Sequence, residues 1–184
     1  EQVANFEAAL REKKYNSEIA ERYGLVASLL RAENIPRAKA ELAKLEEIKA
    51  EGITSMIDPC PCDLGRDIEL TAEVAQRARF QIVAATGLYY ESEGGAAHWK
   101  TRSAFGGAQD EAMAELFIRE LEQGVASTGI RPGIIKVASG FDAITDYETS
   151  VMRAAAKASV VAGVPITTHT DRGTRGPEQQ ATLT

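Results

Sequence analysis

The sequence has few of the residues that build disulfides or metal clusters on their own. Its 184 residues include two cysteines and two histidines. Cys60 and Cys62 flank Pro61, a spacing too short for an unstrained disulfide, and two cysteines are too few for a structural zinc site. We therefore expect both to be reduced thiols with no metal role.

Long apolar runs and basic clusters are also missing. No segment approaches the roughly 18 consecutive apolar residues that a membrane-spanning helix needs, and the first residues lack the basic and apolar regions of a signal peptide. The net charge is −6, with no Lys/Arg run to attract a polyanion. We expect a cytoplasmic protein that binds neither nucleic acid nor membrane.

The sequence does contain short β-rich runs separated by helical patterns. The strands are predicted at residues 53–57, 81–85, 133–138 and 165–169. They are continuous apolar or Thr-rich runs, which is typical of a parallel sheet covered on both faces. A Gly-rich stretch over residues 88–109 follows the second strand and is too long for an ordinary βα turn.

Helices are predicted before and between these strands. Residues 4–32 indicate two short helices, and a clearer helix runs from Pro36 to just before Gly52. Further helices are predicted after an N-cap at Asp67, over 113–121, and from a capping box formed by Thr145 and Glu148 to Gly163.

Two parallel α/β architectures compete for this pattern, the doubly wound open sheet and the closed barrel. The G-x-G-x-x-G turn of many doubly wound sheets is absent, and chemistry at the carboxyl ends of strands is the rule in barrels. We expect an α/β fold, a partial (β/α)8 TIM barrel of about four βα units with N-terminal helices. Its two open parallel edges predict marginal stability or self-association.

Lys136 is the first candidate for chemistry, because it is a lone lysine in the predicted strand 133–138. Alternation places Ile134, Lys136 and Ala138 on one face. Burial lowers the pKa of an amine, which frees it to attack a carbonyl or carbon dioxide. A lysine that reaches solvent or pairs with a carboxylate is the alternative.

Other candidates lie near the carboxyl ends of the strands. His169 ends the strand after that of Lys136, where a neutral imidazole can bind a divalent metal. Tyr89 and Tyr90 follow the strand 81–85 and form either an aromatic wall for a substrate or loop packing. His98 is interpreted as a loop residue that binds no metal.

Four segments of the sequence resemble the phosphotriesterase family of the amidohydrolase superfamily. They are residues 63–67, 82–89, 129–138 and 164–170, and the resemblance is strongest from about residue 39 onward. It implies a (β/α)8 barrel in which two divalent metals, most often zinc, activate a bridging hydroxide against phosphotriesters or lactones. The implied partners are a small-molecule ester, lactone or phosphotriester and a second subunit in a homodimer.

The resemblance also assigns roles to individual residues. Lys136 matches the carbamylated lysine that bridges the metals, and His169 matches a histidine ligand on the next strand. Tyr89 stands where lactone-hydrolysing members usually have a tyrosine, so it favours lactones and, with Tyr90, substrate binding.

The family's first-strand His-X-His pair has no counterpart here, and its later histidine and aspartate would lie beyond Thr184. Residues 1–184 are thus expected to be the N-terminal portion of one barrel domain, truncated at both ends. With two of about six metal-site ligands, the fragment alone is expected to be inactive.

Two other functions stay open at this point. Residues 135–140 also resemble the lysine strand of deoxyribose-phosphate-type aldolases, in which Lys136 would form a Schiff base with a carbonyl substrate. The chain could also be a noncatalytic relative that acts only by association.

Overall fold

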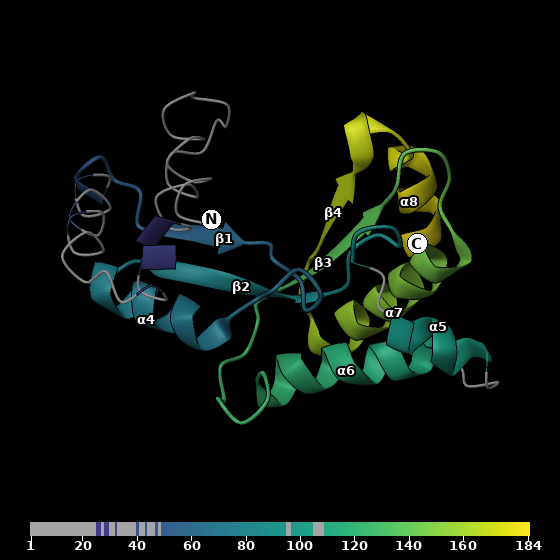
Figure 1. The fold of residues 1–184 in the computed structure, drawn as a ribbon, viewed down its shortest axis with the longest axis horizontal. Helices are drawn as coiled ribbons and strands as arrows, with labels where there is room; N and C mark the ends of the chain where they lie inside the picture. The colour runs from purple at the N-terminus through teal and green to yellow at the C-terminus, as the bar shows by residue number, and fades with distance from the viewer. Residues whose placement is uncertain are drawn as a thin grey trace. The chain divides into compact units, whose positions relative to one another are not determined.

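The computed structural model describes residues 25, 26, 28, 29, 32, 40, 43, 47, 49–94, 97–104 and 109–184. Most of the helices predicted before Gly52 lie outside these residues. The described elements are the strands β1 (Ser55–Asp58), β2 (Gln81–Gly87), β3 (Ile134–Ser139) and β4 (Ile166–Thr170) and the helices α4 (Ile68–Ala78), α5 (Ala97–Ala104), α6 (Gln109–Gln123), α7 (Asp146–Ala162) and α8 (Gly176–Leu183), with a short 3-10 helix at Asp171–Gly173 (Figure 1).

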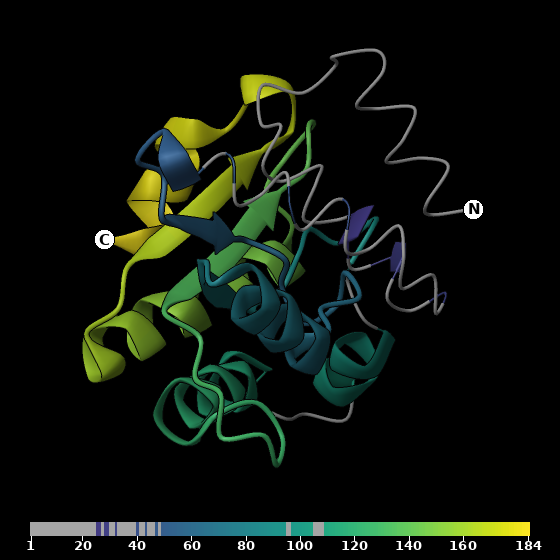
Figure 2. The same ribbon diagram turned by 90° about the vertical axis from the view of Figure 1, so that its left-hand side faces the viewer.

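The four strands form one sheet in the order β1-β2-β3-β4. β2 pairs with β3 in parallel, with Ala85 opposite Ile134, and β3 pairs with β4 in parallel, with Ile135 opposite Ile166. Figure 2 shows β3 and β4 side by side. All four predicted strands are confirmed, with ends shifted by one or two residues.

The chain divides into two compact units, and the first comprises Glu1–Asp58 and Asp67–Ile82. The Asp67 side chain accepts a hydrogen bond of 3.0 Å from the backbone N–H of Leu70, which confirms the predicted N-cap of α4. The described core of this unit consists of Val26, Val74, Ala78 and Phe80, with Met56 and Ile82 packed against it.

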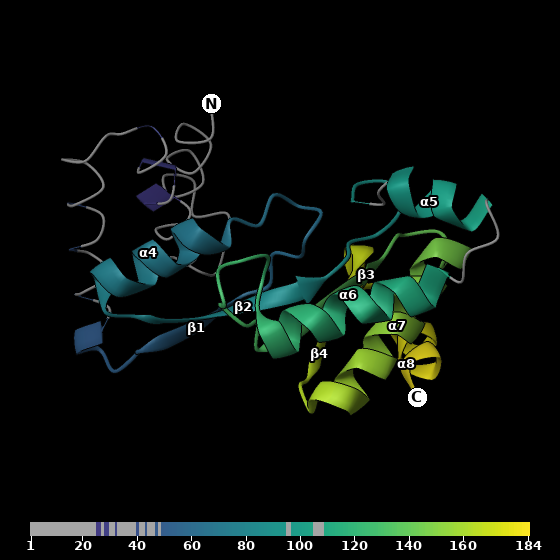
Figure 3. The same ribbon diagram turned by 90° about the horizontal axis from the view of Figure 1, so that it is seen from below.

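The second unit comprises Pro59–Arg66 and Val83–Thr184. Helix α7 packs against α6, α8 and the strands β3 and β4 (Figures 1 and 3). Its predicted capping box is present at Thr145 and Glu148, and Gly163 ends the helix with a φ of +68°. The core under these helices includes Met113, Phe117, Ile135, Val137, Val151 and Met152.

One prediction for this unit is wrong. His98 is not a loop residue, because it is an exposed residue of helix α5, which lies within the stretch 88–109. The buried ring of Trp99 packs α5 against the core. Polar and small residues surround this tryptophan in the sequence, so no helical apolar period indicates the helix.

Within the described residues, no helix is long and apolar enough to span a membrane.

Candidate active site

Lys136 and His169 lie on the same face of the sheet. Lys136 pairs with Thr167, and Ala138 pairs with His169. Lys136 and His169 therefore lie on neighbouring strands, offset by two positions along the strands. Paired residues of parallel strands point to the same side, and so do residues two apart on one strand. The two candidate ligands therefore share one surface near the carboxyl ends of β3 and β4.

Gly87, the last residue of β2, lies opposite Lys136 on the other side of β3. Its φ is +118°, and a Cβ atom built on it would lie 1.9 Å from the carbonyl oxygen of Lys136. Only glycine fits this approach. As a result β2 places no side chain beside Lys136 at this level.

Burial weakens the basicity of both candidate ligands. Lys136 is 9% exposed, and this burial lowers the pKa of its amine. The pKa of His169 is lowered first by burial and then by the positive charge of Lys136, while Asp171 and Glu93 oppose the shift. The amine and the imidazole are thus close enough to interact electrostatically, and both are biased toward the neutral form that binds metals.

Tyr89 and Tyr90 pack against His169. Their ring centroids lie 5.5 Å and 6.1 Å from that of the imidazole, and 4.5 Å from each other. Burial raises the pKa of Tyr89, and a hydrogen bond with Glu93 followed by burial raises that of Tyr90. The structure therefore brings together the four residues that the sequence singles out.

The loop after β1 holds the start of the tyrosine segment in place. The two carboxylate oxygens of Asp63 lie 3.0 and 3.1 Å from the backbone nitrogen of Tyr89, whose N–H they accept. The backbone N–H of Cys62 donates to the carbonyl of Gly87 over 3.1 Å. Burial raises the pKa of Asp63, and the hydrogen bond from Tyr89 opposes that shift.

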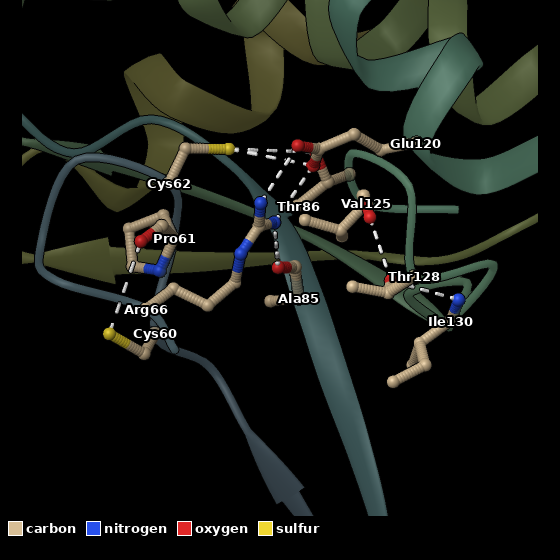
Figure 4. A network of polar contacts seen from close by, with 10 residues as sticks. All are labelled: Cys60, Pro61, Cys62, Arg66, Ala85, Thr86, Glu120, Val125, Thr128 and Ile130. Atoms are coloured by element: carbon tan, nitrogen blue, oxygen red, sulfur yellow. Dashed lines mark hydrogen bonds and ion pairs between the residues drawn. The ribbon is translucent and has the colours of Figure 1, made fainter. Parts of the chain in front are cut away.

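A buried ion pair lies on the opposite face of β2 from Lys136. Arg66 binds Glu120 with two hydrogen bonds of 2.8 and 2.7 Å and donates a third, of 2.9 Å, to the carbonyl of Ala85. The hydroxyl of Thr86 donates to the same carboxylate over 2.7 Å, and the thiol of Cys62 lies 3.6 Å from it (Figure 4). This network joins the loop after β1, strand β2 and helix α6.

Cys60 and Cys62 form no disulfide. Burial, followed by the charge of Glu120, raises the pKa of Cys62 to about 11. A thiol with so high a pKa is protonated at neutral pH, so it is a poor nucleophile and a poor metal ligand.

Gln179 on α8 supports the end of β4. Its side-chain nitrogen donates to the hydroxyl of Ser139 over 2.6 Å and to the backbone carbonyl of His169 over 2.7 Å. Gln179 is 1% exposed, so water cannot replace these bonds. The sequence does not point to Gln179, because a glutamine in a helix has no local pattern that distinguishes a buried position from an exposed one.

Lys136 and His169 supply two nitrogen donors. Elsewhere in the described part of the chain, no group of three or more His, Cys, Asp or Glu residues could hold a metal ion. The pair fits one side of a metal site and not a whole one.

Comparisons with known proteins agree with this arrangement. The sequence profile of the Phosphotriesterase family matches residues 26–184. A phosphotriesterase homology protein from Mycobacterium tuberculosis is 39% identical over 148 residues, 78% of this chain and 44% of the relative. An aryldialkylphosphatase from Saccharolobus solfataricus is 33% identical over 134 residues, 72% of this chain and 40% of the relative.

Solved structures give the same result. The organophosphorus hydrolase from Deinococcus radiodurans superposes with a TM-score of 0.73 and 41% identity, over 79% of this chain and 44% of that one. A mutant of a phosphotriesterase-like lactonase from the same organism gives a TM-score of 0.71 at 39% identity, over 79% of this chain and 46% of that one. The chain spans less than half the length of the relatives that it matches.

The fold is that of an α/β protein whose four parallel strands correspond to part of a (β/α)8 barrel hydrolase. The chain belongs to the phosphotriesterase family.

Proposed function

We propose that the protein hydrolyses small-molecule esters of the lactone or phosphotriester class, with Lys136 and His169 as ligands of a binuclear metal site. The observation that carries this proposal is the placement of both side chains on one face of adjacent strands. Residues 1–184 would supply the N-terminal portion of the barrel, and the remaining ligands would come from the rest of that domain.

The two residues present are suited to such a site. Burial lowers the pKa of Lys136, so its neutral amine is more populated than that of an ordinary exposed lysine. That amine attacks the carbon of carbon dioxide and loses a proton, and the resulting carbamate has two oxygens that can bind two cations. The imidazole of His169, whose pKa is also lowered, offers a neutral nitrogen.

Divalent metals, zinc being the best match to these ligands, would polarise a carbonyl or phosphoryl oxygen and lower the pKa of water. The protein's own residues hold and orient the reactants. Tyr89 and Tyr90 form an aromatic wall beside His169, against which the apolar part of an ester can pack.

The relatives support the substrate class. Those named above are an organophosphorus hydrolase, an aryldialkylphosphatase and a phosphotriesterase-like lactonase. Tyr89 favours lactones as the preferred substrates, and phosphotriesters would be hydrolysed more slowly. We also propose a homodimer as the assembly of the whole protein.

The test uses the full-length protein, in which the rest of the barrel is present. Lys136→Ala should abolish metal-dependent hydrolysis of lactones and phosphotriesters, because the bridging ligand is lost. Lys157→Ala, which removes a half-exposed lysine of α7 paired with Glu111, is the matched control and should keep its activity. Unchanged turnover in the Lys136→Ala variant would refute the proposal.

A second measurement separates this reaction from Schiff-base chemistry. Borohydride treatment with an aldehyde and a chelator should leave Lys136 unmodified, because the metal site needs no imine. A covalent adduct at Lys136 would instead favour an aldolase.

A further inference from the structure

Glu148 accepts hydrogen bonds from three separate backbone groups. Its Oε1 atom lies 3.2 Å from the nitrogen of Glu91 and 3.1 Å from that of Gly140. Its Oε2 atom lies 3.1 Å from the nitrogen of Thr145. The residue is 2% exposed, so these N–H groups and not water satisfy its carboxylate.

Only one of the three bonds belongs to the capping box. In that motif the glutamate returns a hydrogen bond to the N-cap residue, here Thr145, whose hydroxyl in turn accepts the N–H of Glu148 over 3.2 Å. The other two donors come from different loops. Helix capping therefore does not explain why this carboxylate is placed where it is.

The two additional donors belong to the loops that leave the candidate site. Glu91 directly follows Tyr89 and Tyr90, in the loop after β2, and Gly140 follows β3, four positions after Lys136. A single Oε1 atom thus bridges the segment that carries the aromatic wall and the strand that carries the candidate metal-bridging lysine. Bonds from N–H groups to a buried carboxylate are about twice as strong as neutral ones, so the bridge fixes the spacing of the loops.

The same residues surround an open space. A cavity of about 440 Å³ is lined by both loops and by the start of α7, through Glu91, Ser92, Gly140, Phe141, Asp142 and Glu148. Because Glu148 holds both walls, its carboxylate sets how far apart they lie.

We propose that Glu148 is a positioning residue that locks the tyrosine-bearing loop to the end of β3 and so sets the width of the substrate side of the site. It touches neither substrate nor metal in this role and acts through Tyr89 and Tyr90. The catalytic consequence rests on the proposed function, whereas the locking of the loops does not.

Amide hydrogen exchange on the 184-residue chain tests the locking directly. Glu148→Ala removes every acceptor, and Thr145→Ala removes the capping hydroxyl while leaving the carboxylate on both loops. In Glu148→Ala, exchange at the amides of Glu91 and Gly140 should be roughly tenfold faster or more. In Thr145→Ala, exchange at these two amides should stay within about twofold of the wild type, because the cap alone is weakened.

Equal acceleration at these amides in the two variants would overturn the proposal, since the effect would then follow the stability of α7. Glu148→Met covers the case in which the alanine variant does not fold, because its side chain fills a similar volume and has no oxygen acceptor. Exchange at Glu91 or Gly140 faster than in Thr145→Ala supports the lock, and exchange equal to it overturns the lock.

Kinetics of the full-length protein test the catalytic consequence. Glu148→Ala or Glu148→Met should raise KM for an aryl ester or lactone roughly tenfold, with bound metal unchanged, because substrate packing and not metal binding is disturbed. Thr145→Ala should keep its KM. An unchanged KM in the Glu148 variants would overturn the specificity role. If the wild-type protein hydrolyses neither substrate, the proposed function fails, and the exchange result still decides whether the loops are locked.

Discussion

The two faces of the sheet formed by β2, β3 and β4 differ in how the buried polar side chains of the strands themselves are satisfied. On the face covered by helices, Thr86 and Ser139 are fully buried, and each has a short hydrogen bond to a helix side chain, Glu120 and Gln179 respectively. On the other face Lys136 is almost as buried, yet its amine has no carboxylate among the described residues to offset its charge.

Buried polar groups in proteins are normally hydrogen-bonded, and exceptions cluster at functional sites. The helix-covered face, here called the paired face, contributes to stability through these hydrogen bonds. The desolvated amine on the other face costs stability and, in the proposed function, serves with His169 as a ligand. Substitutions that break the pairs should therefore destabilise the protein, and removal of the unpaired amine should not.

The largest effect is expected at the buried ion pair. The side chains of Arg66 and Glu120 are each 8% exposed. Glu120→Gln therefore leaves the buried guanidinium of Arg66 without a counter-charge. We expect the free energy of unfolding to fall by about 3–5 kcal/mol, measured by urea denaturation. Glu122→Gln, an exposed position of the same helix, is the control and should change stability by about 0.5 kcal/mol or less.

The shifted pKa of Glu120 predicts how the stabilisation by the Arg66–Glu120 pair depends on pH. Burial acts to raise the pKa of Glu120, but hydrogen bonds from Arg66 and Thr86 outweigh it and lower the pKa. A lowered pKa in the folded state means that this stabilisation is present above the ordinary carboxyl pKa and is lost as the pH falls through the folded value. Equal stability of wild type and Glu120→Gln at neutral pH would show that the paired face is not stabilised by its ion pair.

Much of the fold could be predicted because its signals are local. Gly and Pro bound the strands, and the caps at Asp67 and Thr145 need only residues within three positions. Lys136 and His169 can be singled out as candidate site residues for the same reason, since each stands out within its own strand. Residue alternation along a strand is enough to place Lys136 on a face.

The supporting residues could not be predicted because their partners are far away in sequence. Arg66 and Glu120 are 54 positions apart, and Glu148 and Glu91 are 57 apart. The pattern indicated Glu148 only as a capping residue, which is one of its three contacts. Tertiary packing decides such pairings, and one sequence carries no signal of it.

The next effect in size is expected at Gln179, which links the paired face to the backbone of His169. Gln179→Leu removes the donor to Ser139 and to the carbonyl of His169, together with a side-chain oxygen that has no partner among the described residues. We expect a loss of about 2 kcal/mol in the free energy of unfolding. Gln180→Leu makes the same change at an exposed neighbour and should have little effect. Similar losses in both variants would mean that the hydrogen bonds of Gln179 add nothing.

The smallest effect is expected at Lys136 and has the opposite sign. Lys136→Met replaces a desolvated amine that has no carboxylate partner among the described residues. It should raise the free energy of unfolding by about 1 kcal/mol at pH 7, in buffer free of metal and bicarbonate. Because burial lowers the pKa of Lys136 in the folded state, the wild type gains stability as the pH rises from the folded toward the unfolded pKa. The advantage of Lys136→Met should therefore shrink between pH 7 and pH 10. Urea denaturation at both pH values measures the difference in unfolding free energy between Lys136→Met and the wild type. A variant less stable than the wild type at pH 7 would mean that the amine is paired, and the contrast between the two faces would then fail.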